Sequence, residues 1–238
     1  MWQGIIRLPA FLRDLASFTR QYSGPMEYMP CLHDRSMTAG ATESEYFWQD
    51  LLVARWIREA RPRRHVDVGS RLDGFVAHVA SYRQIEVFDI RPLPVSIPGV
   101  TFTQHDLMGD TVESRLAMCD SLSCLHALEH FGLGRYGDPV KARGLETGLR
   151  NLAAMLEPGG TLYLAVPVGR QRVLFNANWI FAPHTILECA RGLGLELVRF
   201  ASFQDGSLQE HEHTEAGISS VTGVDYALGI FRFAKAVA

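Results

Sequence analysis

The first 60 residues show helical patterns of apolar and charged positions. Apolar side chains recur every three or four positions over residues 2–20 and 45–60, and charged side chains occupy the opposite face. Residues 21–42 hold two glycines and two prolines, which favours a loop or lid. Thr42 followed by Glu45 is typical of a capping box. The buried face of the second helix is expected to consist of Tyr46, Phe47, Leu51, Ala54, Trp56 and Ile57.

From residue 61 onward, short apolar runs alternate with helical patterns. Strands are expected at residues 65–68, 85–90, 100–102, 120–125, 161–166, 195–202 and 226–233. Helices are expected at residues 74–81, 144–156 and 183–193. Residues 204–222 are polar and predict a long exposed loop. Because alternating strands and helices are typical of a parallel α/β sheet, we expect a helical extension or lid over residues 1–60 and an α/β domain over residues 61–238.

Composition narrows the class of protein. The 238 residues are 47% apolar and 21% charged, and the net charge of −3 provides no basic field for nucleic acid. No run of about 18 apolar residues exists, so no transmembrane helix is expected. The four cysteines form no Cys-x-x-Cys pair and the start of the chain lacks the order of a signal peptide, which favours a cytoplasmic location. The first helix has Trp2 and several arginines, which are residue types that suit a membrane–water interface. A weak peripheral contact with a membrane is therefore an alternative to packing on the domain.

Acidic residues and a glycine follow the first three predicted strands. Asp67 and Gly69 begin the segment after the first strand, where glycine lets the backbone approach a ligand and a helix N-terminus presents free N–H groups. The Gly-x-Gly-x-x-Gly spacing of dinucleotide sites is absent. Asp89 ends the second strand, where a carboxylate can accept hydrogen bonds from both ribose hydroxyls, although helix caps use the same residue type. Asp106 can accept from an adenine amino group, with Leu107 beside the ring.

Two further motifs follow in order, Leu128-Glu129-His130 after the fourth strand and Leu156-Glu-Pro-Gly-Gly-Thr-Leu162 before the fifth. With them, residues 60–235 resemble class I S-adenosylmethionine-dependent methyltransferases. The resemblance implies a Rossmann-like fold with a mostly parallel seven-stranded sheet and an antiparallel last strand, and S-adenosylmethionine as the cofactor. It carries cofactor-binding roles over to Asp67, Gly69, Ser70, Arg71, Phe75, Asp89, Ile90, Asp106, Leu107 and Leu125.

Arg71 stands where the first loop of that superfamily usually has its middle glycine. The arginine could pair with the cofactor carboxylate or occlude the pocket. More closely, residues 66–75, residues 123–139 and Phe175-Asn176 resemble a domain-of-unknown-function family within the superfamily, in which this arginine is part of the pattern. Relatives in that family are often associated with surface-polysaccharide or other glycan genes. This resemblance implies a sugar or glycan as the acceptor.

His126 and His130 lie just past the fourth strand, where the resemblance places the transferred methyl group. Histidine suits proton removal at neutral pH, and Glu129 could orient one of the two imidazoles. A structural role of Glu129 and His130 as local caps is the alternative. The order His-Glu-x-x-His and a third ligand are both lacking, so no metal site is expected.

Polar side chains that could contact the acceptor follow the fourth and fifth strands. They are Arg135, Tyr136, Asp138, Arg172, Asn176 and Asn178. An arginine suits a carboxylate or phosphate on the acceptor. Arg135 could instead pair with Asp138 inside its own glycine-rich loop.

The sequence therefore predicts an S-adenosylmethionine-dependent methyltransferase that methylates a hydroxyl of a sugar, glycan or other small molecule. Nitrogen and carbon acceptors stay open within this prediction. An enzyme with a nicotinamide or nucleotide-sugar cofactor is a rival, which the absent glycine motif disfavours. The second rival is a non-catalytic Rossmann-like module that binds a cofactor or a nucleotide sugar. No interface patch is legible in the sequence, so the oligomeric state stays open.

Overall fold

The computed structural model divides the chain into two compact units, residues 1–42 and residues 43–238. It describes residues 2–40, 42–109, 116–212 and 214–237, and side chains from residue 7 onward. None of the described helices is both long enough and apolar enough to cross a membrane.

The first unit contains helix α1 (Trp2–Thr19) and a short 3-10 turn, η1 (Asp34–Ser36). The guanidinium of Arg7 donates a 3.0 Å hydrogen bond to the carbonyl of His33, and Arg35 pairs with Asp14 at 2.5 Å. These two contacts join the loop to the helix. The side chain of Trp2 lies outside the described residues, so a membrane contact of this helix remains a prediction, as does a lid.

Helix α2 (Glu45–Ala60) belongs to the second unit, although the sequence pattern groups it with the extension. Its N-cap is Ser44, whose hydroxyl accepts a 3.3 Å hydrogen bond from the Tyr46 N–H, so the predicted capping box is wrong. Ala54, Trp56 and Ile57 are buried as expected, whereas Phe47 is 38% exposed and Leu51 is 48% exposed. The helix buries the stripe through positions 49, 52, 53, 56 and 57, and positions 47 and 51 lie off it.

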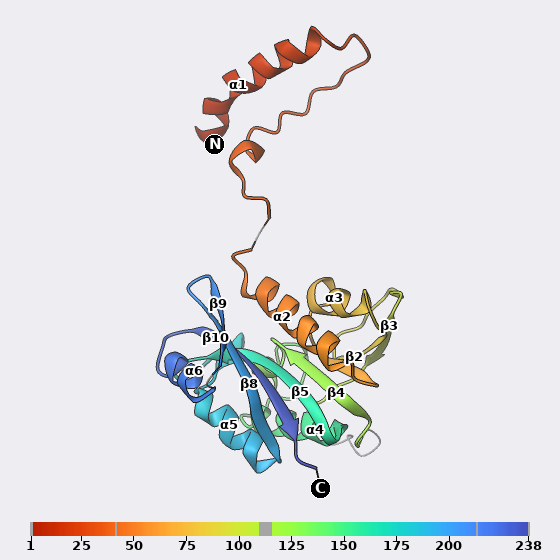
Figure 1. The fold of residues 1–238 in the computed structure, drawn as a ribbon, viewed down its shortest axis with the longest axis vertical. Coiled ribbons are helices and arrows are strands. Elements are labelled where there is room, and N and C mark those ends of the chain that lie inside the picture. Colours follow the sequence, from red (N-terminus) through yellow and green to blue (C-terminus); the bar gives the residue numbers. More distant parts are fainter. Residues whose placement is uncertain (1, 41, 110–115, 213, 238) are drawn as a thin grey trace. The chain divides into compact units, whose positions relative to one another are not determined.

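An eight-stranded sheet forms the centre of the second unit, in the order β3-β2-β1-β4-β5-β10-β8-β9 (Figure 1). The strands are β1 (His65–Val68), β2 (Ile85–Asp89), β3 (Val100–Gln104), β4 (Cys119–Leu125), β5 (Leu156–Val168), β8 (Leu195–Gln204), β9 (Ser207–His211) and β10 (Ala227–Lys235). The first five strands of that order pair in parallel, and β10 is antiparallel to both β5 and β8. The predicted fold class and the antiparallel last strand are confirmed, and β9 is one strand more than expected.

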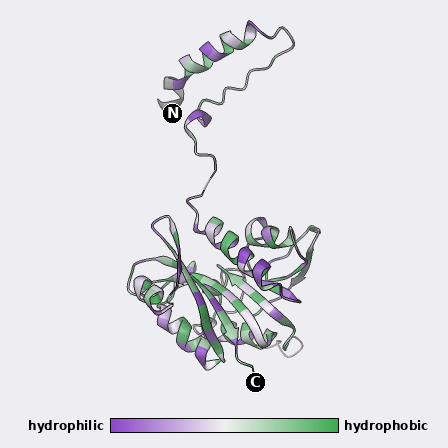
Figure 2. Ribbon diagram, viewed as in Figure 1, coloured by the Kyte–Doolittle hydropathy of each residue, from purple (hydrophilic) through white to green (hydrophobic). Residues whose placement is uncertain are grey.

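Helices cover both faces of this sheet. The connecting helical elements are the π-turn η2 (Leu72–Val76), α3 (Ala77–Ala80), η4 (Leu128–His130), α4 (Gly144–Met155), α5 (Pro183–Gly192) and α6 (Thr214–Val221). Trp56 of α2 and Val79 of α3 belong to one apolar cluster, and Leu149 of α4 and Ile186 of α5 belong to another. Figure 2 shows that the strands between them are mostly apolar. A separate small sheet pairs β6 (Arg172–Leu174) with β7 (Asn178–Ile180).

Residues 204–222 are not the long loop that their polarity predicts. They contain β9, which forms a hairpin with β8, and helix α6. The turn is Asp205-Gly206 with φ values of 52° and 76°, which is the backbone geometry that two-residue hairpin turns require. On the hairpin, the His211 ring stacks on Phe200 at 5.4 Å and its Nε2 lies 2.8 Å from the Ser202 hydroxyl. Edge pairing therefore stabilises a strand that buries little apolar surface.

Candidate functional site

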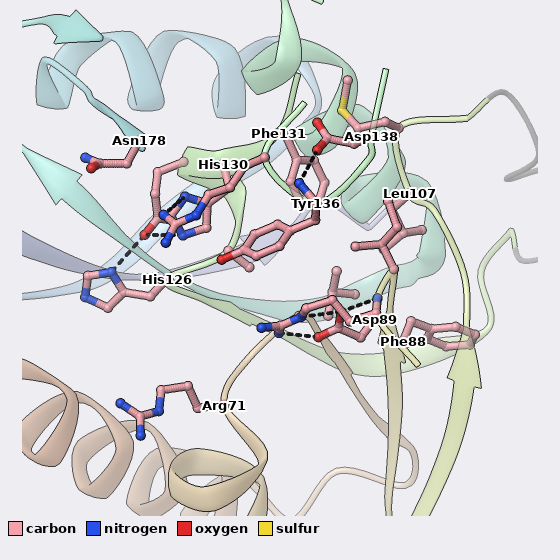
Figure 3. Close-up of a pocket in the computed structure, with 18 of the residues that line it drawn as sticks. Arg71, Phe88, Asp89, Leu107, His126, His130, Phe131, Tyr136, Asp138 and Asn178 are labelled. Carbon is pink, nitrogen blue, oxygen red and sulfur yellow. Dashed lines mark hydrogen bonds and ion pairs between the residues drawn. The ribbon is translucent and has the colours of Figure 1, made fainter. Parts of the chain in front are cut away.

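A cavity of about 420 Å³ opens at the carboxyl ends of β1, β2, β3 and β4, between the loops that follow them. Its volume lies within the roughly 300–1,000 Å³ that is usual for small-molecule sites. The start of α2, β7 and the residue before β10 complete its wall. Figure 3 shows Asp89 and Leu107 on one side of the cavity and His126, His130 and Asn178 on the other. The parallel topology thus gathers the sequence-predicted loops at one edge of the sheet.

Asp67 and Ser70 lie beneath the first loop and are both buried. The Asp67 carboxylate accepts hydrogen bonds from the Ser70 hydroxyl at 2.6 Å, the Ser70 N–H at 3.1 Å and the Ser123 hydroxyl at 2.5 Å. The Ser70 hydroxyl accepts in turn from the Leu125 N–H at 3.1 Å. Burial raises the pKa of Asp67 to about 7, against the opposing effect of these hydrogen bonds. These two residues join β1 to β4 and shape the loop from below.

Gly69 and Arg71 of the same loop line the cavity. Gly69 has a φ of 72°, and a Cβ there would lie 2.9 Å from the Cβ of Ala127, so the position requires glycine. The Arg71 guanidinium makes two hydrogen bonds to Asp73, at 3.0 and 2.7 Å, and lies 5.1 Å from the centre of the Tyr46 ring. Arg71 therefore lines the cavity with a guanidinium that is already paired with Asp73.

Asp89 ends β2 at the cavity and already has a partner. Its carboxylate accepts three hydrogen bonds from Arg91, from the backbone N–H at 2.8 Å, from Nε at 2.9 Å and from Nη2 at 2.5 Å. The sequence pattern did not single out Arg91, which stands two residues past the predicted ribose contact. A ribose at Asp89 would share the carboxylate with Arg91 or displace the guanidinium.

The other residues predicted to contact the cofactor divide into two groups. Ile90, Asp106 and Leu107 line the cavity, and an Asp106 carboxylate oxygen accepts a 2.7 Å hydrogen bond from the Met108 N–H. Phe75 and Leu125 instead lie within the apolar cluster that α2 covers. Their apolar side chains stabilise the sheet beneath the site.

His126 sits between two carboxylates. Its Nδ1 lies 2.8 Å from Oε1 of Glu129 and its Nε2 lies 3.3 Å from Oε1 of Glu45, while its ring packs 4.5 Å from that of Tyr46. Burial lowers the pKa of His126, but the hydrogen bond and charge of Glu129, with those of Glu45, outweigh it and raise the pKa to about 9. Glu45 also accepts a 2.6 Å hydrogen bond from the Tyr226 hydroxyl. His126 is therefore an imidazolium at neutral pH.

His130 has a different protonation state. Its Nδ1 lies 2.8 Å from the carbonyl of Ala177, which can only accept, and 3.3 Å from Nη1 of Arg135, which donates to the same carbonyl. The neutral tautomer that satisfies the shorter contact has its proton on Nδ1 and a lone pair on Nε2. Burial lowers the pKa of His130, so the ring is neutral at pH 7. Nε2 lies 3.9 Å from Oε1 of Glu129, and the residue lines the cavity. This geometry suits a proton acceptor.

The glycine-rich loop after η4 is held by Asp138. Its carboxylate accepts from the N–H groups of Gly132, Gly134 and Tyr136 at 3.0, 3.2 and 3.2 Å. The Arg135 guanidinium donates to the Ala177 carbonyl at 2.8 Å, so each member of the anticipated Arg–Asp pair has another partner.

Tyr136 lies between two arginines at the cavity. Its ring centre lies 5.0 Å from the Arg91 guanidinium and 5.2 Å from that of Arg135. Both arginines already donate hydrogen bonds, Arg91 to Asp89 and Arg135 to the Ala177 carbonyl, so a ligand would use their remaining N–H groups. Arg135, Tyr136 and Asp138 all line the cavity, in agreement with their predicted placement.

The β6–β7 segment contributes one of its three predicted residues. Asn178 lines the cavity, and its amide donates a 3.0 Å hydrogen bond to the Trp179 carbonyl. Arg172 points away, donating to the Arg170 carbonyl at 3.0 Å, and Asn176 is exposed outside the cavity.

The predicted site lacked several of the lining residues, among them Glu45, Tyr46, Arg91 and Tyr226. The helical spacing of apolar residues assigned Tyr46 to the buried face of its helix. Glu45 and Tyr226 are 181 positions apart, and no local pattern in the sequence joins them. Among the described residues, no group of three His, Cys, Asp or Glu side chains is arranged to hold a metal ion.

Comparison with known proteins gives a family and a fold. The sequence model of the family described as "Caenorhabditis protein of unknown function, DUF268" matches residues 99–227, just over half of the chain. No curated protein matches the sequence.

Solved structures resemble the chain at low sequence identity. The N-methyltransferase NodS from Bradyrhizobium japonicum WM9, in complex with S-adenosylhomocysteine, has a TM-score of 0.55 and 16% identity over 83% of this chain and 89% of its own. The 1,6-didemethyltoxoflavin-N1-methyltransferase of Burkholderia thailandensis has a TM-score of 0.53 and 17% identity over 96% and 89%. The [4+2]-cyclase SpnF has a TM-score of 0.56 and 17% identity over 79% and 82%. These likenesses confirm the Rossmann-like methyltransferase fold, which also supports a cyclase.

Proposed function

We propose that this chain, which belongs to the family described as "Caenorhabditis protein of unknown function, DUF268", is an S-adenosylmethionine-dependent methyltransferase. The observation that carries the proposal is that two kinds of polar residue line opposite sides of one cavity. One side presents the carboxylates of Asp89 and Asp106, and the other presents neutral His130 beside Glu129. The fold shared with methyltransferases adds support.

The residues around the cavity fit such a cofactor. Gly69 brings backbone to the cavity wall without a side chain, and Leu107 and Ile90 give an apolar surface suited to an adenine ring. Asp89 is the group that would accept from ribose hydroxyls, and Asp106 the group that would accept from the adenine amino group. When bound, S-adenosylmethionine would supply a methyl group on a positively charged sulfur.

His130 is the better of the two candidate bases. A base needs a free lone pair, which Nε2 of neutral His130 has and which the imidazolium of His126 lacks. Proton transfer from the acceptor to Nε2 would leave His130 positively charged beside Glu129, which would stabilise that charge. Glu129 and His126 thus have a positioning and electrostatic role in this proposal.

The acceptor that we propose is a hydroxyl of a sugar, glycan or other small molecule. Arg135, Tyr136 and Asn178 line the cavity near His130 and supply hydrogen-bond donors and an aromatic face of the kind that sugars bind. The sugar assignment comes from the resemblance to glycan-associated relatives. The cytoplasmic location remains a prediction from the sequence.

Calorimetry with S-adenosylmethionine and S-adenosylhomocysteine tests the proposal directly. We expect the wild-type protein to bind both at micromolar concentration and Asp89→Ala to lose most of the affinity. Nicotinamide dinucleotides and nucleotide sugars, titrated in parallel, should give no heat. Binding of a nucleotide sugar without binding of S-adenosylhomocysteine would overturn the proposal in favour of a non-catalytic module.

A further inference from the structure

The buried carboxylate of Glu129, a residue that lines the cavity next to His126, has one oxygen without a hydrogen-bond partner among the described residues. Glu129 is 1% exposed and lines the cavity, and its Oε1 accepts from His126. Its Oε2 is buried and has no hydrogen-bond partner within the part of the chain that the structure describes. A buried carboxylate oxygen without a partner is costly for a folded protein, so this position has a negative charge that a nearby cation would stabilise.

The cluster around Glu129 carries a net negative charge. It combines the carboxylates of Glu45 and Glu129 with the single positive charge of His126. The Tyr226 hydroxyl donates to Glu45 and adds no charge. Because the side chains of the cluster are at least four-fifths buried, water screens their charge poorly.

Neighbouring charges leave this imbalance in place. Arg71 lines the cavity, but its charge is offset by the ion pair with Asp73 and is half exposed to solvent, and His130 is neutral. The Nη1 of Arg135 donates to the Ala177 carbonyl and lies 3.3 Å from Nδ1 of His130, but the side chain is exposed, so solvent screens its charge more than that of the buried carboxylates. The part of the cavity beside His126 and Glu129 therefore attracts a cation.

This inference rests on the proposed function and concerns which form of the cofactor the site prefers. The sulfur of S-adenosylmethionine is one carbon beyond the ribose. With adenine at Asp106 after β3 and ribose at Asp89 on β2, as proposed above, the sulfur would lie toward β1 and β4, the next strands in the sheet, and Glu129 follows β4. We propose that Glu129 and Glu45 recognise the positive charge of the sulfonium and make the site prefer S-adenosylmethionine over neutral S-adenosylhomocysteine.

The negative charge of Glu129 and Glu45 would stabilise a positive charge both before and after methyl transfer. As the acceptor O–H bond breaks, its proton goes to Nε2 of His130, the oxygen forms a bond to the methyl carbon, and the carbon–sulfur bond breaks with its electron pair left on sulfur. One positive charge leaves the sulfur and one arrives at His130, which is 3.9 Å from Glu129. The cluster then holds the neutral product cofactor less tightly, which favours its release.

Calorimetric titration of three probes tests the inference without an acceptor. The probes are S-adenosylmethionine, S-adenosylhomocysteine and sinefungin, which carries an ammonium group in place of the methylsulfonium. In Glu129→Gln, we expect affinity for both cationic probes to fall at least tenfold, because a unit charge within about 10 Å of the probe's cation is lost at an effective dielectric constant of about 20. Affinity for S-adenosylhomocysteine should stay within about twofold. Glu188→Gln on α5, an exposed acid outside the cavity, is the matched control.

Each outcome separates the inference from the proposed function. If Glu129→Gln keeps the wild-type ratio of cationic to neutral probe affinities, the inference is wrong while the cofactor site stands. If the wild-type protein binds none of the probes, the proposed function fails as well. Should Glu129→Gln not fold by circular dichroism, Glu45→Gln in the first turn of α2 gives the same readout, with the same fall expected for the cationic probes.

Discussion

The two histidines of the site differ in charge, and this difference predicts which one is needed for turnover. His130→Ala should lower turnover about 10²–10⁴-fold, because the lone pair on its Nε2 is lost. Its affinity for S-adenosylhomocysteine should stay within about twofold. Since burial lowers the pKa of His130, turnover of the wild type should fall on the acid side with an apparent pKa below the ordinary 6.5.

Steady-state kinetics against pH, with an acceptor found in a sugar screen, would measure both effects. His184→Ala on α5 is the control, since His184 is exposed and outside the cavity. Full turnover by His130→Ala would rule His130 out as the base.

The titration of Asp67 predicts that the free energy of unfolding depends on pH. Its pKa is raised to about 7 in the folded protein, so its contribution to stability is present below about 4 and is lost as pH rises through 7. His65, whose pKa burial lowers to about 3, acts in the opposite direction, since its contribution grows as pH rises from 3 to 6.5. The two effects offset each other in the wild type, so a variant is needed to separate them.

Asp67→Asn isolates the carboxylate. The free energy of unfolding of this variant relative to wild type should rise with pH by up to about 1.4 kcal/mol per unit between about pH 4 and 7, and then level off. Urea unfolding of both proteins at several pH values would measure it. A difference that is constant over this range would show that the Asp67 carboxyl is already ionised at pH 4.

Residue-level prediction from the sequence succeeded where the chain order itself brings residues together. Asp89, Asp106 and His130 each follow a strand of a parallel sheet, and such strand ends must meet at one edge. Glu45 and Tyr226 could not be found this way, because their contact depends on how α2 packs against the sheet. The burial of Asp67 beneath the loop could not be predicted either, because it depends on hydrogen bonds to Ser70 and Ser123 that the spacing of residues does not reveal.

At the scale of elements, the start of α2 connects helix stability to the site. Ser44 caps the helix whose first turn carries Glu45 and Tyr46 into the cavity wall. Ser44→Ala should lower the free energy of unfolding by about 1 kcal/mol, because an N–H in the first turn loses its acceptor. Thr42→Ala, at the position of the predicted capping box, is the comparison and should cost less. Chemical denaturation of both variants would measure the two losses. An equal or larger loss of unfolding free energy in Thr42→Ala would contradict the assignment of Ser44 as the N-cap.

The β8–β9 hairpin shows why an element escaped prediction. Its second strand lies at the sheet edge with little apolar surface, so the hydrophobic pattern is weak, and the informative signal was the Asp205-Gly206 turn. Gly206→Ala should destabilise the protein by about 1–2 kcal/mol, because φ at Gly206 is 76°. Gly192→Ala, at the end of α5 with open space around it, should be neutral or stabilising. Thermal unfolding of the pair measures the contrast, and equal midpoints would contradict the turn geometry.

At the scale of the whole molecule, the position of the cavity within one compact unit predicts how that unit behaves on its own. The residues that line the cavity run from Glu45 to Tyr226 and so fall within the unit 43–238. That unit also contains both apolar clusters, so residues 43–238 expressed alone should fold and bind S-adenosylhomocysteine within about twofold of the full chain. If residues 1–42 act as a lid over the acceptor, this fragment should keep cofactor affinity and lose turnover. Calorimetry and kinetics on the two proteins measure each effect, and loss of cofactor binding by a folded fragment would show that residues 1–42 contribute to the cofactor site.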